Sequence, residues 1–317
     1  MFELLTPDIA WVMIATLEVL LVAGIAYLLL NKKSAQPLPL SIRENLVHAS
    51  WALFFICLPL LANQNGALLL YALLSYFCFK DYLNVLPPKP LDSRLVFWAL
   101  LCVPLQYGLI ASQCSLPILV LASFTWFILL GLRTISIQGA EDFLKTWLFM
   151  SFGAVLCVYS LSHFALLITQ IQSLASALIF YMLLLCLFYR ATQRGLQRYH
   201  HRWPINVPLQ ATEDSEKSLL SLGYWDPILL AGLLTIIAGV LIAPIFTPLT
   251  LIESMLTSSS LVCAYQIVDS LLLALHQDQN AKLHRGIFPH GWCFKHTQHF
   301  AAMATLLYYL YWGFWSA

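Results

Sequence analysis

Long apolar runs separated by short polar segments make up most of the chain. Ten of these runs are each about 17 to 25 residues long, enough for a helix to cross the hydrocarbon core of a membrane. They lie near residues 9 to 30, 46 to 62, 66 to 86, 95 to 112, 116 to 132, 146 to 170, 173 to 189, 226 to 249, 251 to 275 and 298 to 316. The pattern predicts an all-α, polytopic integral membrane protein with about ten transmembrane helices. Pro59 and Pro104 fall inside two of the runs and are expected to kink those helices.

The basic residues predict how these helices are oriented. All 16 Lys and Arg residues fall in or beside every second loop of the ten-helix arrangement. The five groups are Lys32, Lys33 and Arg43; Lys80, Lys89 and Arg94; Arg133 and Lys145; Arg190, Arg194, Arg198, Arg202 and Lys217; and Lys282, Arg285 and Lys295. The other loops, near residues 63, 115, 172 and 250, carry none. Because basic loops of membrane proteins stay in the cytoplasm, we expect both termini to lie outside, in the periplasm, and the chain to be a multi-pass protein of the cell inner membrane.

The composition agrees with a membrane protein and argues against other classes. Hydrophobic residues fill 60% and charged residues 10% of the 317 positions, far from the average of soluble proteins. The net charge of +1 and the topological placement of the basic residues argue against nucleic-acid binding. The eight cysteines are scattered, without a C-x-x-C pair, and are interpreted as small apolar residues. The first run lacks a basic start and a small-residue cleavage site, so it is expected to be a retained helix.

We expect a single membrane domain over residues 1–317, since no stretch has the composition of a separate soluble domain. Two cytoplasmic loops, near residues 190–224 and 276–297, are large enough to form the candidate site.

Asp269 is the first candidate residue, because it lies inside the ninth apolar run. An ionisable group at that depth usually faces a watered cavity or a bundle interior, which favours a functional role. A protonated or hydrogen-bonded acid that helps helices associate is the structural alternative. Glu18, in the first run, allows the same two interpretations.

A series of arginines with a spacing of four forms the second candidate. Its members are Arg190, Arg194, Arg198 and Arg202. On a helix they lie along neighbouring parts of one face, where they could bind lipid phosphates or a nucleotide triphosphate through bidentate hydrogen bonds. A topological anchor at an anionic leaflet explains the same series and is the favoured interpretation.

The last quarter of the chain carries a spaced set of polar residues between two apolar runs. It consists of Asp269, Lys282, the run Pro289-His290-Gly291-Trp292 and the run Lys295-His296-Thr297-Gln298. This set resembles the signature of phosphatidate cytidylyltransferases, the CDP-diacylglycerol synthase family, which reads roughly G-D, a Ser with K-R, K-D and then P-G-H-G-G-x-x-D-R-x-D. Leu283, Lys295 and Gln298 stand where three of the four signature acids would be.

The loop after residue 198 also resembles the family, whose members carry something like G-K-H-K-x-x-P-K-V-S-P-x-K-T-W there. His200, Pro204 and Pro208 match this pattern, whereas several of its lysines are replaced. The acid that family members carry late in the preceding helix is missing, because no Asp or Glu occurs from Phe143 to Thr212. In order and spacing the resemblance spans about residues 45 to 315.

The resemblance implies a reaction of phosphatidate with CTP that releases pyrophosphate. It also implies a catalytic set of Asp269, Lys282, His290 and Gly291, with Mg²⁺ at Asp269 if the protein is active. Because metal held by carboxylates drives such chemistry, the missing acids favour a catalytically weak or inactive relative. Such a protein would bind phosphatidate or CDP-lipid, or act as a scaffold for another membrane enzyme; the family is often oligomeric, so a homodimer is a further expectation.

Two alternatives stay open. An active enzyme would need acids from elsewhere near Asp269, and the candidates are Asp81, Glu213, Asp214, Glu216 and Asp278. A polar-lipid carrier would need a continuous polar path, and its candidates are Glu18, Gln106, His163, Gln266 and Asp269. A metal site built from His284, His290, Cys293, His296 and His299 is disfavoured, because steps of three rotate around a helix.

Overall fold

The computed structural model describes residues 64–85, 92–138, 143–171, 174–202, 222–278 and 292–315. Within these ranges the chain is helical and contains no strand, as the apolar pattern predicts. The α-helices are α3 (Gln64–Val85), α4 (Ser93–Leu100), α5 (Cys102–Ala111), α6 (Leu116–Gln138), α7 (Phe143–Ala154), α8 (Ser160–Leu166), α9 (Ala175–Arg202), α10 (Leu222–Phe246), α11 (Leu251–Asp278) and α12 (Trp292–Leu310). Three π-helical turns continue these helices, namely η3 (Val155–Tyr159), η4 (Leu167–Ile171) and η7 (Tyr311–Trp315).

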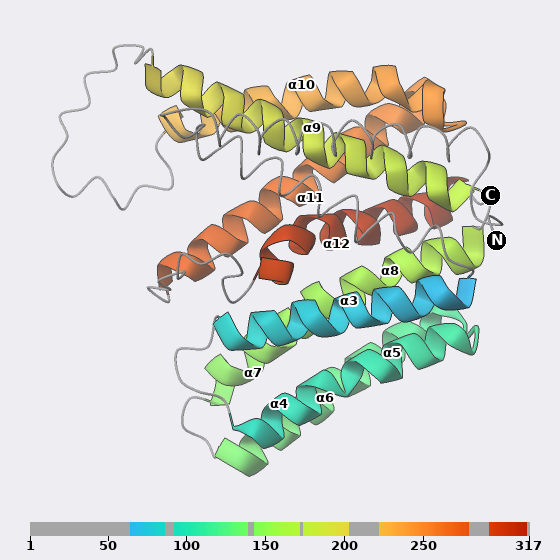
Figure 1. The fold of residues 1–317 in the computed structure, drawn as a ribbon, viewed down its shortest axis with the longest axis vertical. Coiled ribbons are helices and arrows are strands. Elements are labelled where there is room, and N and C mark those ends of the chain that lie inside the picture. The colour runs from blue at the N-terminus through green and yellow to red at the C-terminus, as the bar shows by residue number, and fades with distance from the viewer. Residues whose placement is uncertain are drawn as a thin grey trace, which may run out of the picture.

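The helices form two groups with α12 between them. In Figure 1, α9 and α10 lie at the top, α4, α5 and α6 at the bottom, and α12 in the middle. Helix α12 packs against α3 and α8 of the lower group and against α9 and α11 of the upper group. Most of its described side chains are buried, including Phe300, Ala304 and Tyr308. The carboxy-terminal helix therefore joins the two groups of the bundle.

Seven helical segments within the described residues are long and apolar enough to cross a membrane. They correspond to seven of the predicted runs, from Gln64–Asn84 to Leu251–Leu271. The first two predicted runs, residues 9 to 30 and 46 to 62, lie outside the described residues. The tenth run is the helix α12, whose polar amino-terminal half keeps it out of the apolar set. A polytopic all-α membrane protein is confirmed at this level, and the count of ten and the sides of the termini remain predictions.

The helix that contains Pro104 is interrupted at one residue, Leu101, near the predicted kink. Helix α4 ends at Leu100 and α5 begins at Cys102, so the break lies within four residues before the proline. Proline lacks an N–H group and its ring clashes with the carbonyl group four residues earlier, which explains this position. Pro59 lies outside the described residues.

The helix ends that carry basic residues meet at one end of the bundle. Helices α3, α6, α9 and α11 end there, and α4, α7, α10 and α12 begin there (Figure 1). Arg94, Arg133 and Arg190 lie on the parts of α4, α6 and α9 toward this end. The far ends of these helices carry no described basic residue, as the spacing in the sequence requires.

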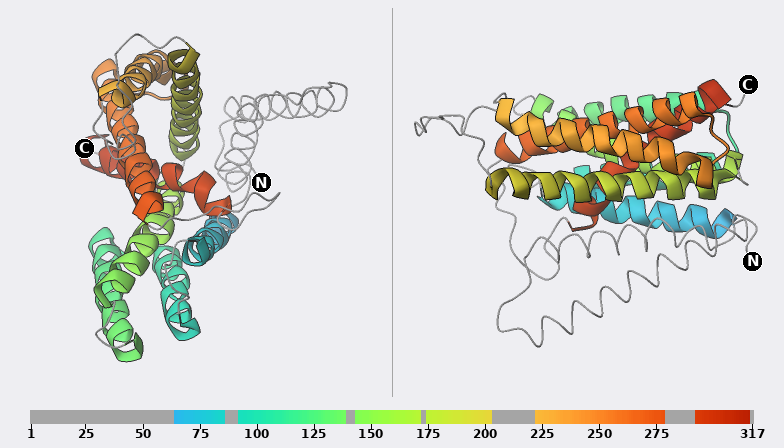
Figure 2. Two further views of the ribbon diagram at one scale, coloured as in Figure 1. Left: turned by 90° about the vertical axis from the view of Figure 1, so that its left-hand side faces the viewer. Right: turned by 90° about the horizontal axis from the view of Figure 1, so that it is seen from above.

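The outer faces of the described helices are strongly apolar. Leu229, Leu233, Ile237 and Leu241 form an exposed row on α10, with exposed fractions of 50% or more. Figure 2 shows α10 on the outside of the upper group. A continuous apolar surface of this kind marks contact with lipid in a protein of this composition.

Candidate functional site

Asp269 lies where α9, α11 and α12 meet. Its Oδ1 atom is 3.4 Å from Nε2 of His299 on α12. The Gln193 side chain of α9 also forms a hydrogen bond with the carboxylate, and Arg190 lies close enough to act on it electrostatically. Residues more than seventy positions apart in sequence thus form one polar cluster, defined here as the Asp269 cluster: Arg190, Gln193, Asp269 and His299.

Two tyrosines form an aromatic wall beside this cluster. The Tyr265 ring, one turn before Asp269 on α11, stacks on the His299 ring with centroids 4.2 Å apart and planes 19° apart. The Tyr189 ring also packs against the Tyr265 ring, with ring centroids 4.6 Å apart. Because Tyr265 and Tyr189 are each 2% exposed, the histidine ring has a fixed orientation toward the acid.

Burial is uneven across the cluster. Arg190 and Gln193 are each 8% exposed and His299 is 4% exposed, whereas the Asp269 side chain is 44% exposed. The carboxylate is therefore partly exposed, whereas the arginine and the histidine beside it are buried. His299 Nδ1 is buried and has no hydrogen-bond partner among the residues that the structure describes. A bound polar group would satisfy that atom, as buried polar atoms normally require.

The structure brings together only some of the residues that the sequence singled out. Asp269 and Arg190 are neighbours, and Arg194 lies one turn further along α9, half-buried. Arg198 and Arg202 of the arginine series lie in the last turns of α9, as does His200, which we also expect to bind the phosphate or lipid headgroup; their side chains fall outside the described set. Lys282, His290 and Gly291 also lie outside the described residues, so the rest of the predicted catalytic set stays a prediction.

Two features of the Asp269 cluster were not predicted from the sequence: the part played by Gln193, and the pairing of His299 with Asp269. Gln193 is three residues from Arg190, so helical spacing places both on one face and could have indicated it. The pairing of His299 with Asp269 joins helices thirty residues apart and has no local signal in the sequence.

The described residues around Asp269 do not suit a magnesium ion. They offer a single carboxylate, whose neighbours are an imidazole, an amide and a guanidinium group. Magnesium prefers several oxygen ligands, and the positive guanidinium would repel it. No group of three or more metal-ligating side chains occurs within the described ranges.

The other proposed acids do not complete the site in the described part of the chain. The Asp81 carboxylate, on α3, accepts a hydrogen bond of 3.0 Å from the backbone N–H of Cys293 in the first turn of α12. Asp81 therefore caps a helix, which is a structural use of its charge. Glu213, Asp214 and Glu216 lie outside the described residues, as does the side chain of Asp278.

Cys293 and His299, the described members of the histidine and cysteine series, contact different helices. Cys293 Sγ lies 3.0 Å from Cys78 Sγ on α3, whereas His299 pairs with Asp269 on α11. Those two residues therefore do not share a site. His284, His290 and the side chain of His296 lie outside the described set.

The residues of the polar-path hypothesis divide between the two groups of helices. Gln106 forms hydrogen bonds with Ser123 and Ser162, at 3.0 and 3.3 Å, in the lower group. His163 on α8 lies 2.8 Å from the Tyr159 carbonyl oxygen and 3.5 Å from the Thr305 hydroxyl of α12. The Asp269 cluster touches α12 on its other side, six residues before Thr305. Glu18 lies outside the described residues.

Comparison with known proteins gives little further information. No protein-family model matches the chain. No solved structure matches it either. A protein described as uncharacterized protein YnbB, from Escherichia coli strain K12, is similar to it, with 24% identity over 250 residues that cover 76% of this chain and 78% of that protein. That similarity attaches no activity to the chain, so its function has to be argued from the site.

Proposed function

We propose that the chain is a multi-pass inner-membrane protein of phospholipid metabolism that binds phosphatidate or CDP-lipid. It would be a relative of phosphatidate cytidylyltransferases that is catalytically weak or inactive and acts as a lipid-binding or scaffold partner. The observation that carries the proposal is the Asp269 cluster, in which a single carboxylate faces a buried arginine and a buried histidine.

The charges of this region favour an anionic ligand. Arg190 and Arg194 lie one turn apart on α9, and Asp269 supplies the only carboxylate in the described cluster. A phosphomonoester can accept charge-assisted hydrogen bonds from guanidinium groups, which are stronger than neutral ones. In the proposed complex such a group contacts Arg190, Arg194 and His299 beside the exposed side of Asp269.

The same arrangement is poor for nucleotidyl transfer. That reaction depends on charge neutralisation at the phosphates, which carboxylate-held metal commonly supplies. Removing one such contribution commonly costs about a hundredfold in rate. A triphosphate held by cationic side chains equally well before and during reaction is bound but not accelerated.

The test is CDP-diacylglycerol formation from CTP, phosphatidate and Mg²⁺ by the purified full chain. An Asp269→Asn variant of equal helicity is the matched control, and an authentic family member in the same micelles shows that the assay works. We expect no turnover above the control, with phosphatidate binding that weakens in Arg190→Gln. Turnover by the wild-type chain well above that of Asp269→Asn would establish an active enzyme. If the wild-type chain shows neither turnover nor phosphatidate binding, the lipid-binding role fails.

The active enzyme remains the second candidate, with CTP as substrate and further acids supplied by Glu213, Asp214, Glu216 or Asp278. The carrier is the third, and transport of a labelled polar lipid into vesicles would identify it. Cross-linking in native membranes would test the predicted homodimer or membrane-enzyme partner.

A further inference from the structure

A polar pocket lies between α4 and α6, apart from the Asp269 cluster. Its volume is about 590 Å³, within the range of about 300 to 1,000 Å³ typical of ligand sites. The lining includes Arg94, Arg133, Trp98, Asp92 and Ser136. In Figure 1, α4 and α6 lie at the bottom of the bundle and α9 and α11 in its upper part. The pocket therefore uses none of the helices that build the Asp269 cluster.

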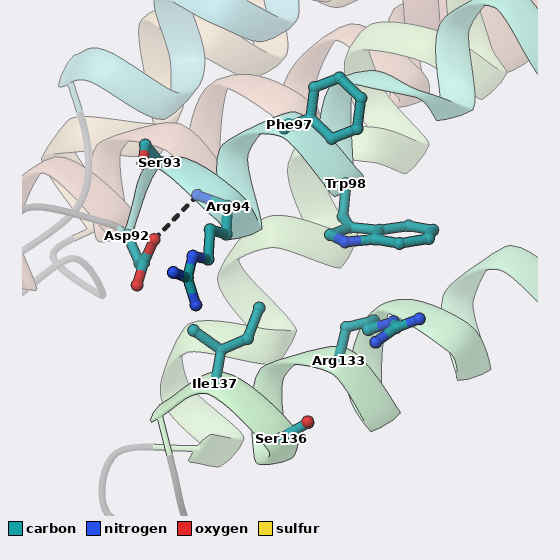
Figure 3. A pocket seen from close by; sticks show the side chains of 8 residues that line it. All are labelled: Asp92, Ser93, Arg94, Phe97, Trp98, Arg133, Ser136 and Ile137. Atoms are coloured by element: carbon teal, nitrogen blue, oxygen red, sulfur yellow. Dashed lines mark hydrogen bonds between the residues drawn. The ribbon is translucent and has the colours of Figure 1, made fainter.

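Two arginines line this pocket, one on each of its helices. Figure 3 shows Arg94 of α4 reaching toward Ile137 of α6, and Arg133 of α6 lying beneath the indole of Trp98; both arginines line the pocket. The Arg133 Cζ atom lies 4.5 Å from the centre of the Trp98 ring, a cation–π contact that orients the side chain. Neither guanidinium forms an ion pair with a carboxylate among the described residues.

The lining contains one acid, whose oxygen is already engaged. Asp92 caps α4, and its Oδ1 atom accepts a hydrogen bond of 2.8 Å from the Arg94 backbone N–H. Two guanidinium groups against one carboxylate leave a formal charge of +1 in the lining. The pocket therefore suits a compact anion.

The depth of the pocket suggests where that anion comes from. One candidate span begins at Ser93 and another ends at Ile137, so both arginines lie at the level where spans meet the aqueous phase. Phe97, beside them, is 63% exposed in an apolar belt. Phosphate groups of lipids occupy this level of a membrane, and arginines there bind them.

A separate apolar cavity lies deeper in the same group of helices. It has a volume of about 320 Å³ and is lined mainly by apolar side chains of α5, α6, α7 and η3. Trp98 of the polar pocket packs against Trp126 of the cavity, with ring centroids 6.2 Å apart. Trp126 precedes Arg133 by seven residues on α6, which is about 10 Å along a helix.

Two polar atoms in the cavity lack a described partner. Trp126 Nε1 and Ser151 Oγ are buried without a hydrogen bond among the residues that the structure covers, and both residues line the cavity. The indole N–H and the hydroxyl can both donate to an ester carbonyl. If the cavity were empty, the two unsatisfied donors would lower the stability of the fold.

We propose that the pocket and the cavity together form a binding site for one anionic glycerophospholipid. Its phosphate lies in the pocket that Arg94 and Arg133 line, and one acyl chain occupies the cavity beside Trp126. The phosphate of such a lipid matches the cationic pocket, and its ester and chain match the unsatisfied donors and apolar side chains that line the cavity. This site goes beyond the proposed function and does not depend on the Asp269 cluster.

Native mass spectrometry of the full chain in detergent tests the headgroup. It counts bound lipids in a mixture of dioleoyl phosphatidylglycerol and dioleoyl phosphatidylcholine. We expect one retained anionic lipid, and a loss of affinity of about tenfold for each arginine changed in Arg94→Gln and Arg133→Gln. The matched control is Lys145→Gln, which removes a charge from exposed α7 surface at the same end and should leave the adduct unchanged. Asp92→Asn keeps the cap and should strengthen binding.

The acyl cavity is tested with Ala154→Phe, which fills part of it. That variant should weaken the binding of the dioleoyl lipid and leave the binding of the short-chain dihexanoyl lipid unchanged. Glycerol 3-phosphate and inorganic phosphate form a separate arm. If they bind as tightly as the lipid, the site is one for soluble phosphate and the lipid proposal fails.

Equal binding in the arginine variants and wild type, or equal losses in Lys145→Gln, would also overturn the lipid proposal. An Arg190→Gln variant separates this site from the Asp269 cluster. If it removes the same adduct, the lipid lies at that cluster and the second site fails; if it leaves the adduct, the second site stands whatever becomes of the proposed function.

Discussion

Gly153 offers the sharpest test of the packing between α3, α7 and α12. A Cβ atom added at Gly153 would collide with the Tyr82 ring and lie 2.9 Å from Cε2 of Phe79. Both rings are 0% exposed. The Tyr82 hydroxyl donates a 2.8 Å hydrogen bond to the Phe149 carbonyl oxygen, and the Tyr82 and Phe149 rings stack with centroids 4.6 Å apart. Gly153→Ala can therefore be accommodated only by moving Tyr82 or by separating the helices.

The expected cost follows from these contacts. Loss of the hydrogen bond costs about 1 kcal/mol, and loss of the stacking costs about 1 kcal/mol more. Overpacking strain adds about 1–3 kcal/mol, while replacing glycine within a helix returns about 1 kcal/mol. We expect Gly153→Ala to lower the free energy of unfolding by about 3 kcal/mol. Gly108→Ala, where nothing lies within 4 Å of the added atom, should raise it by about 0.5–1 kcal/mol.

Thermal unfolding of the purified protein in one detergent, followed by helicity, measures both variants. Adding Tyr82→Leu to Gly153→Ala should give a smaller loss than the sum of the two single changes, because the leucine leaves room for the methyl group. A Gly153→Ala protein that unfolds at or above the wild-type temperature would show that this junction is not packed as described.

Two further changes test how the helices are joined. Tyr181→Phe removes a hydroxyl that bonds to Ser258 at 2.8 Å and to a carbonyl oxygen of α10, and should lower the free energy of unfolding by about 1 kcal/mol. Tyr76→Phe, on a partly exposed ring, should change it little, and an equal loss in both variants would contradict the assignment. Asp81→Ala removes the acceptor of the Cys293 N–H in the first turn of α12 and should cost about 0.5–2 kcal/mol. Asp81→Asn should recover part of this stability, and hydrogen exchange at the start of α12 would show whether the cap is lost.

The apolar pattern was sufficient for the class of fold and for most spans, because a membrane selects on length and hydrophobicity alone. Seven predicted runs correspond to candidate spans, and the break before Pro104 follows from local chemistry. The position of α12 was not predictable in this way. Its amino-terminal half is polar, and it is buried because it packs between two groups of helices.

Asp269 and the arginine series could be recognised from the sequence, since a charge in an apolar run is conspicuous and spacing by four marks a helix face. The sequence by itself thus determined an all-α membrane protein and which charged residues need a partner. Only the tertiary structure decided the partners: His299 of α12 pairs with Asp269 of α11, and Arg94 of α4 and Arg133 of α6 line one pocket. Such pairings depend on which helix faces pack together, and the local sequence of each helix does not determine its packing partner.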